Sequence, residues 1–180
     1  MPRSTTKKSG NSTGVSQLEE YFLQELKDIF GAEKQLTKAL PKLQKAATTE
    51  ELKEALEEHL AVTQEHIARI EEVFELMEKK PNSKKCEAME GITKEGETVV
   101  KETEAGSMTR DAAIIMAAQK VEHYEIATYG GLVQLAKTIG RDDVADILAQ
   151  TLEEEKETDQ LLTEIAEAHI NAEAHEEEAE

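Results

Sequence analysis

Acidic and histidine residues interrupt the apolar stripes of four predicted helices, and their types are those of metal ligands. The stripes follow from placing residues at 100° intervals around each helix axis, and every stripe contains polar groups on its inward line. Carboxylate oxygens and imidazole nitrogens together suit divalent transition-metal ions. The predicted ligands are Glu33, His59, His66, Glu122, Glu125, Glu155 and Asp159.

These side chains are expected at similar heights in the folded chain. Folding the first two helices about the turn between them brings Glu33 opposite the midpoint of His59 and His66. Folding the last two helices in the same way brings Glu125 opposite Glu155. Two independent hairpins therefore place their inward polar groups near mid-helix, as one shared site requires.

A buried layer of five carboxylates needs a source of positive charge. An isolated carboxylate in a dry interior costs several kcal/mol, so proteins protonate it, pair it or supply a cation. No Lys or Arg lies on the inward lines of these helices. Two divalent cations would supply about +4 against about −5, and a set rich in carboxylates and poor in histidine favours iron or manganese over zinc or calcium.

The ligand spacing differs from the usual di-iron pattern of a four-helix bundle. That pattern uses Glu-x-x-His on two helices, and the motif is absent from this sequence. Instead, Glu122 and Glu125 are three residues apart, and the second helix offers only histidines. His59 and His66 lie about 10.5 Å apart along a helix axis, so they could bracket two ions but not share one.

The composition requires helices to hold these residues. Ala, Glu, Lys, Leu and Arg make up about half of the 180 residues, Pro occurs three times and Trp is absent. The predicted class is all-α, with long helices over about 16–45, 48–80, 109–140 and 141–170 and a shorter one over 84–103.

The spacing of these helices predicts a ferritin-like four-helix bundle. Short turns join the first pair and the last pair, and a long crossover carries the extra helix between them. Ser16 and Thr109 are expected N-caps, Gly31 and Pro41 are expected to weaken or kink the first helix, and Tyr129 could donate a hydrogen bond to Glu125. The predicted organisation is a disordered basic tail (1–14), a bundle domain (15–170) and an acidic frayed tail (171–180).

Charge and cysteine content narrow the function classes. The formal charge is −18, from 39 acidic and 21 basic residues, which disfavours nucleic acid and anionic membranes as partners and attracts cations. No apolar run approaches the roughly 20 residues of a membrane span. The first residues contain no apolar segment typical of a secretory signal. A single cysteine, Cys86, excludes an internal disulfide and favours a cytoplasmic location.

Four segments resemble the YciE/YciF family of ferritin-like stress proteins. They are AEKQLTKALPKL (32–43), KKCEAMEG (84–91), RDAAIIMAAQKVEHYEIATYG (110–130) and TLEEEKETD (151–159). The resemblance implies a homodimeric ferritin-like bundle with a di-metal centre and stress-related bacterial expression. It matches every predicted ligand except His66, where some relatives carry Gln, and relatives also carry a carboxylate at the position of Val62.

The sequence therefore predicts a stress-associated protein that binds two iron or manganese ions and handles O2, peroxide or the metal itself, with oxidoreductase activity left open. Glu33 and Glu125 are the expected terminal ligands, and Glu122 and Glu155 the expected bridges. An alternative is a metal-free helical stress protein that acts as a structural or interaction module. Iron storage in a hollow shell is disfavoured, because the layout lacks an additional short C-terminal helix.

Overall fold

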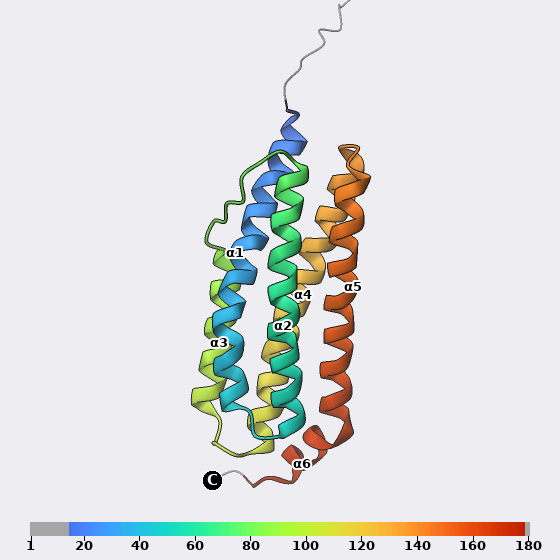
Figure 1. Ribbon diagram of the computed structural model, residues 1–180. Helices are drawn as coiled ribbons and strands as arrows, with labels where there is room; N and C mark the ends of the chain where they lie inside the picture. Colours follow the sequence, from blue (N-terminus) through green and yellow to red (C-terminus); the bar gives the residue numbers. More distant parts are fainter. Residues whose placement is uncertain (1–14, 179–180) are drawn as a thin grey trace, which may run out of the picture.

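The computed structural model describes residues 15–178, which form helices and no strand. Four long helices lie side by side, and a shorter helix packs against two of them (Figure 1). The helices are α1 (Gln17–Ala46), α2 (Glu50–Leu76), α3 (Glu87–Glu102), α4 (Met108–Thr138), α5 (Asp142–Ile165), the π-helix η1 (Ala166–Ile170) and α6 (Asn171–Glu176). The all-α prediction is confirmed. The tail expected at 1–14 lies outside the described residues.

The helices form two antiparallel hairpins, α1–α2 and α4–α5, with α3 on the long connection between them (Figure 1). This is the predicted ferritin-like arrangement. Helix α2 ends at Leu76 rather than near 80, and the chain then runs back along α1 before α3 begins (Figure 1). The hairpins bring one apolar face of each long helix to a common interior.

Gly31 allows the crossover to pass directly over α1. A Cβ atom at this position would lie 1.7 Å from the carbonyl oxygen of Lys84, and the Lys84 amide donates to the Lys27 carbonyl at 3.1 Å. Helix α1 continues without a break from Gln17 to Ala46. The glycine therefore provides space for a neighbouring backbone rather than ending the helix, and Pro41 is also accommodated inside it.

Side-chain caps begin two of the long helices. The Ser16 hydroxyl accepts a hydrogen bond from the Glu19 amide, which confirms the predicted cap of α1. At α4 the cap is Ser107, whose hydroxyl accepts from the Arg110 amide at 3.1 Å. The prediction of Thr109 as the cap is wrong by two residues.

The last helix, α6, and Glu177 after it pack beside the start of α4. Residues 171–176 are helical, and the Glu177 carboxylate then accepts from the amides of Met108 and Thr109 at 2.6 and 2.9 Å. A carboxylate at a helix N-terminus satisfies free amides and complements the helix dipole. The acidic end thus has a specific contact where the sequence suggested only fraying.

The core consists of the predicted apolar stripes together with a polar layer near mid-height. Phe22, Leu26 and Ile29 of α1 are fully buried, as are Leu148 of α5 and Tyr129 of α4 to within one per cent. None of the described helices combines the length and hydropathy needed to cross a bilayer. The buried polar residues are Glu33, His59, Thr63, His66, Asp111, Glu122, Glu125, Thr151 and Glu155.

Candidate metal centre

Six of the seven predicted ligands meet in the interior of the bundle. They form two groups in which one ligand atom per residue lies within 4.8 Å of the others. The first group contains His59, Glu122, Glu125 and Glu155, and the second contains Glu33, His66 and Glu155. Glu155 belongs to both groups, so the six residues form one centre with two adjacent parts.

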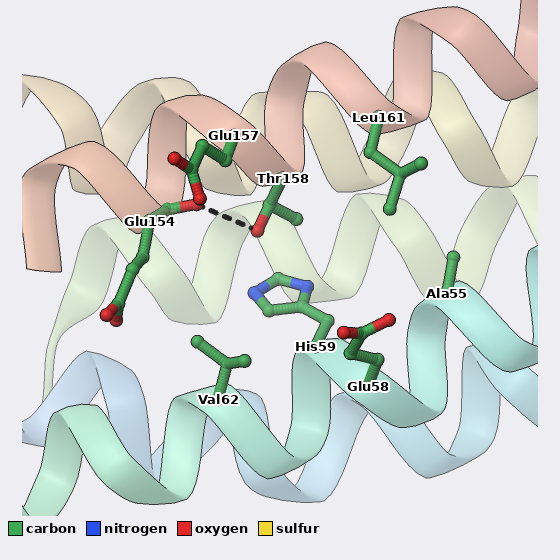
Figure 2. Close-up of a pocket in the computed structure, with 8 residues that line it drawn as sticks. All are labelled: Ala55, Glu58, His59, Val62, Glu154, Glu157, Thr158 and Leu161. Carbon is green, nitrogen blue, oxygen red and sulfur yellow. Dashed lines mark hydrogen bonds between the residues drawn. The ribbon is translucent and has the colours of Figure 1, made fainter.

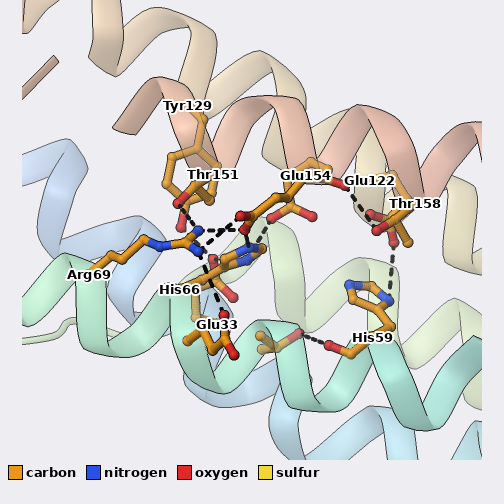
Figure 3. A network of polar contacts seen from close by, with 12 residues as sticks. Glu33, His59, His66, Arg69, Glu122, Tyr129, Thr151, Glu154 and Thr158 are labelled. Atoms are coloured by element: carbon orange, nitrogen blue, oxygen red, sulfur yellow. Dashed lines mark hydrogen bonds and ion pairs between the residues drawn. The ribbon is translucent and has the colours of Figure 1, made fainter. Parts of the chain in front are cut away.

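Each long helix contributes to the centre from its inward face (Figure 3). Glu33 comes from α1, the two histidines from α2, Glu122 and Glu125 from α4, and Glu155 from α5. Thr63 lies between the histidines, and its hydroxyl donates to the His59 carbonyl at 2.8 Å rather than to a ring. No hydroxyl of the described residues therefore forms a hydrogen bond with the His59 ring.

The centre holds ten buried atoms that have no hydrogen-bond partner within residues 15–178. They include both ring nitrogens of His59 and both carboxylate oxygens of Glu122, Glu125 and Glu155. Leaving one such atom unsatisfied costs about 1–3 kcal/mol, and more for a charged group. Imidazole nitrogens and carboxylate oxygens in this number fit the ligand set of a pair of divalent cations.

Distances between rings and carboxylates are consistent with shared ligation rather than hydrogen bonding. His59 Nδ1 lies 3.4 Å from Glu122 Oε1. His66 Nδ1 lies 3.1 Å from Glu155 Oε1 and 3.6 Å from Glu33 Oε1. These ring nitrogens have no hydrogen bond among the described residues, so each imidazole presents a nitrogen to neighbouring carboxylates.

Burial changes the protonation of the centre in the absence of a cation. It raises the pKa of Glu122 and Glu125 well above the usual value, and the Glu155 carboxylate adds to the effect. Burial, with Glu155, also raises the pKa of Glu33 to about 8. The pKa of His59 falls to about 4 because burial disfavours its charged form. A cation would replace the protons that these carboxylates otherwise need.

His66 is held by a second carboxylate outside the centre. Its Nε2 lies 2.9 Å from Glu154 Oε2, and since a carboxylate only accepts, Nε2 is the donor. Burial would lower the pKa of His66, but Glu155, Glu33 and Glu154 together raise it to about 9. Glu154 in turn forms an ion pair with Arg69, whose Nη2 donates a hydrogen bond to Glu154 Oε1 at 2.9 Å (Figure 3).

The sequence did not predict a role for Glu154, because this residue lies in a run of glutamates that is typical of a solvent-exposed surface. Arg69 was the available signal, since it lies one turn after His66 on α2 and could bring a carboxylate to that ring. In metal sites, a carboxylate on the far nitrogen of a histidine fixes the ring and its tautomer. Glu154 has this position relative to His66.

Tyr129 donates its phenol to Glu33 Oε1, not to Glu125. The hydroxyl reaches across from α4 to α1, and the ring meets the His66 imidazole edge-on, with centroids 6.3 Å apart. The predicted bond to Glu125 is wrong. Tyr129 is fully buried and therefore a fixed neighbour of the Glu33 and His66 part of the centre.

Asp159 does not join the other predicted ligands. Its carboxylate accepts from the Gln119 amide at 3.3 Å and lies 3.4 Å from His123 Nε2. The Asp159 side chain is 24% exposed, whereas that of Glu155 one turn earlier is buried. The rotation of α5 turns Asp159 toward the outer edge of α4, away from the interior.

Comparisons with known proteins place the chain among bacterial relatives. The family described as a domain of unknown function (DUF892) matches residues 17–175. Protein YciF of Escherichia coli (strain K12) is 46% identical over 161 residues, which cover 89% of this chain and 96% of YciF.

Two solved structures have the same fold. The crystal structure of the E. coli stress protein YciF aligns with a TM-score of 0.82, covering 87% of this chain and 99% of YciF. YcfI from Rhodopseudomonas palustris aligns with a TM-score of 0.80 at 40% identity, covering 84% of this chain and 96% of YcfI.

Proposed function

The chain belongs to the DUF892 family and has YciF as a relative, which confirms the resemblance found in its sequence. On this basis we propose that it is a ferritin-like protein that binds two iron or manganese ions. E. coli YciF is named a stress protein, and we propose a stress-associated role for this chain as well. Residues 15–170 would form the metal-binding domain. The protein would act on O2, on peroxide or on the metal ions themselves.

The observation that carries the proposal is the set of ten buried ligand atoms that have no hydrogen-bond partner among the described residues. Four buried carboxylates, those of Glu33, Glu122, Glu125 and Glu155, balance the charge of two divalent cations. No Lys or Arg side chain is buried among the described residues. Protons or cations must therefore neutralise the layer, and the paired grouping favours two cations.

The grouping assigns ligands to the two ions. Glu33 and His66 would hold one ion, and His59, Glu122 and Glu125 the other, with Glu155 between them. In this assignment Glu122 would be a ligand of one ion, whereas the sequence suggested a second bridge. Asp159 would contribute only if α5 rotated. Bound iron or manganese would supply redox or Lewis-acid chemistry.

Elemental analysis tests the proposal. We expect purified chain, reconstituted anaerobically with Fe²⁺ or Mn²⁺ and desalted, to retain about two ions per chain. Glu122→Ala with Glu155→Ala should remove most of this metal, whereas Glu71→Ala with Glu72→Ala, on the exposed face of α2, should not. Wild-type protein that retains no metal after both reconstitutions would overturn the proposal.

A second candidate, a metal-free structural or interaction module, is favoured by the proton-binding groups of the centre. The pKa of Glu33 is raised to about 8 by burial, and His66 stays charged to about 9 because of its carboxylate neighbours. These protons could neutralise the layer without metal. A melting temperature that a strong chelator leaves unchanged, in protein purified from stressed cells, would favour this candidate.

We also propose that the protein is a cytoplasmic homodimer, as the family resemblance implies. Support comes from the α1–α4 face, where Tyr21 is 54% exposed beside a cavity of about 380 Å³ lined partly by Ala127 and Gly131. Light scattering of the wild type and of Gly131→Lys tests this, since a lysine on the interface should yield monomers. A monomeric wild type would contradict the dimer.

A further inference from the structure

A groove lies between α2 and α5, and its lining includes His59 of the proposed metal centre (Figure 2). Its volume is about 220 Å³, and residues of these two helices alone line it. The helices belong to different hairpins, so the groove lies on the seam where the hairpins meet. Val62 and Leu161 form apolar walls, and the imidazole of His59 stands between the helices at the floor.

His59 connects this groove to the buried carboxylates. The residue is only 4% exposed, and both ring nitrogens lack a hydrogen-bond partner among the described residues. One edge of the ring faces the groove, while Nδ1 lies 3.4 Å from Glu122 Oε1 inside the centre. His59 is therefore a buried, unpartnered ligand that is reached from outside through the groove.

The rim of the groove is negatively charged. Glu58, Glu154 and Glu157 line it, and no Lys or Arg does. Glu154 is paired with Arg69, but Glu58 and Glu157 make no ion pair within the described part of the chain. A cleft lined by one sign of charge concentrates ions of the opposite sign, so this opening attracts cations and repels anions.

Two other cavities in the described part of the chain are lined by residues outside the centre. One between α1, α3 and α4 is lined by residues such as Leu36 and Gly96, and another between α1 and α4 by residues such as Tyr21 and Gly131. Neither contains a member of the two ligand groups. The groove on the α2–α5 seam differs from both because His59 belongs to its lining and to the centre.

We propose that the groove between α2 and α5 is the route by which divalent transition-metal ions reach the centre, and that His59 is the first buried ligand they meet. The inference rests on the proposed metal-binding function and extends it. Glu58 and Glu157 attract the hydrated ion to the rim. His59 then binds the ion beside Glu122. From this position the ion can reach the carboxylates of Glu125 and Glu155.

Stopped-flow mixing of the full-length, metal-free chain with Co²⁺, followed by visible absorbance, tests this route. At low ionic strength we expect Glu58→Gln with Glu157→Gln to slow association about three- to tenfold, because the attracting charge is lost. The number of ions bound at equilibrium should stay the same. In about 1 M salt, where the Debye length falls to about 3 Å, the difference from wild type should largely disappear.

Glu71→Gln with Glu72→Gln is the matched control, because it also removes two negative charges, from positions on α2 that lie about 2.5 turns or more beyond Val62 of the groove. A second variant, Val62→Trp, should slow association by filling the groove, with Leu76→Trp on the same helix as its control. Circular dichroism checks that each variant is folded. If Val62→Trp is unstable, Glu58→Gln with Glu157→Gln still tests the route.

The outcomes separate the route from the function. Slower association in both groove variants, with control rates equal to wild type, supports the route. Unchanged rates in a groove variant that still binds the full number of ions would overturn the route alone. A wild-type chain that binds no Co²⁺ would overturn the proposed function and the route with it.

Discussion

His66 Nε2 and Glu154 Oε2 lie 2.9 Å apart, and this contact decides which ring nitrogen faces the candidate metal centre. With Nε2 donating outward, Nδ1 points to Glu155 at 3.1 Å. Arg69 holds Glu154 from the other side. The pKa of Glu154 is lowered to about 2, because these partners outweigh its partial burial, so its carboxylate stays charged.

Glu154→Ala should weaken metal binding without abolishing it. Loss of the outer partner frees the His66 ring, and such changes typically cost about 10- to 100-fold in metal affinity. Competition titration against a chelator of known affinity measures the effect. Glu153→Ala is the control, because Glu153 is an exposed neighbour whose carboxylate pairs with Lys156 at 2.7 Å. Equal affinities of the two variants would show that Glu154 does not position His66.

The metal-free protein should lose stability as the pH rises from about 6.5 to 9. Burial raises the pKa of Glu33 from 4.5 to about 8, and its stabilising contribution is lost as the pH rises through that value. The pKa of His66 rises from 6.5 to about 9, so the stabilising contribution of His66 is lost as the pH rises through that interval. In both cases the native state holds a proton that the unfolded chain has released.

His59 acts in the opposite direction but at lower pH. Its pKa falls from 6.5 to about 4, so its contribution is complete above 6.5 and is lost as the pH falls below that. Thermal melts across pH 6.5 to 9 therefore exclude the His59 contribution and report on His66 together with the buried carboxylates, whose pKa values are raised. Saturating Mn²⁺ should remove most of the slope, since metal replaces the protons. A flat profile in metal-free protein would contradict the protonated layer.

Tyr129→Phe should destabilise the metal-free protein by about 1–3 kcal/mol, because Glu33 then loses its phenol partner in a fully buried site. The shape of the ring is kept, so little packing is lost. Urea denaturation measures the change in the free energy of unfolding. Tyr21→Phe is a suitable control, since Tyr21 is 54% exposed. Wild-type stability in Tyr129→Phe would mean that Glu33 is satisfied without the phenol.

Gly31→Ala should lower the free energy of unfolding by about 1–3 kcal/mol, the usual cost of overpacking. The new Cβ would lie 1.7 Å from the Lys84 carbonyl oxygen, so the crossover would have to move. Gly91→Ala on α3 is the matched control, because nothing lies within 4 Å of its added Cβ. That control should be neutral or more stable by up to about 1 kcal/mol. Equal effects would argue against a tight crossover.

The sequence by itself determined the helices and most of the centre. A 3.6-residue period places Glu33, His59 and Glu155 on apolar faces, and short turns force paired helices to run antiparallel. Those two constraints are local, so they also set the heights of the polar groups. The six predicted ligands that meet in the structure were all found this way.

Only the tertiary structure decided which neighbours of Glu155 face inward. Asp159 and Glu154 are both close to it in sequence, yet Asp159 turns toward Gln119 and Glu154 toward His66. A helix rotation of a few tens of degrees separates these outcomes, and a pattern sampled every 100° cannot resolve it. Tyr129 likewise reaches Glu33 on another helix, because side-chain contacts across a bundle depend on how the helices pack and not on spacing along one of them.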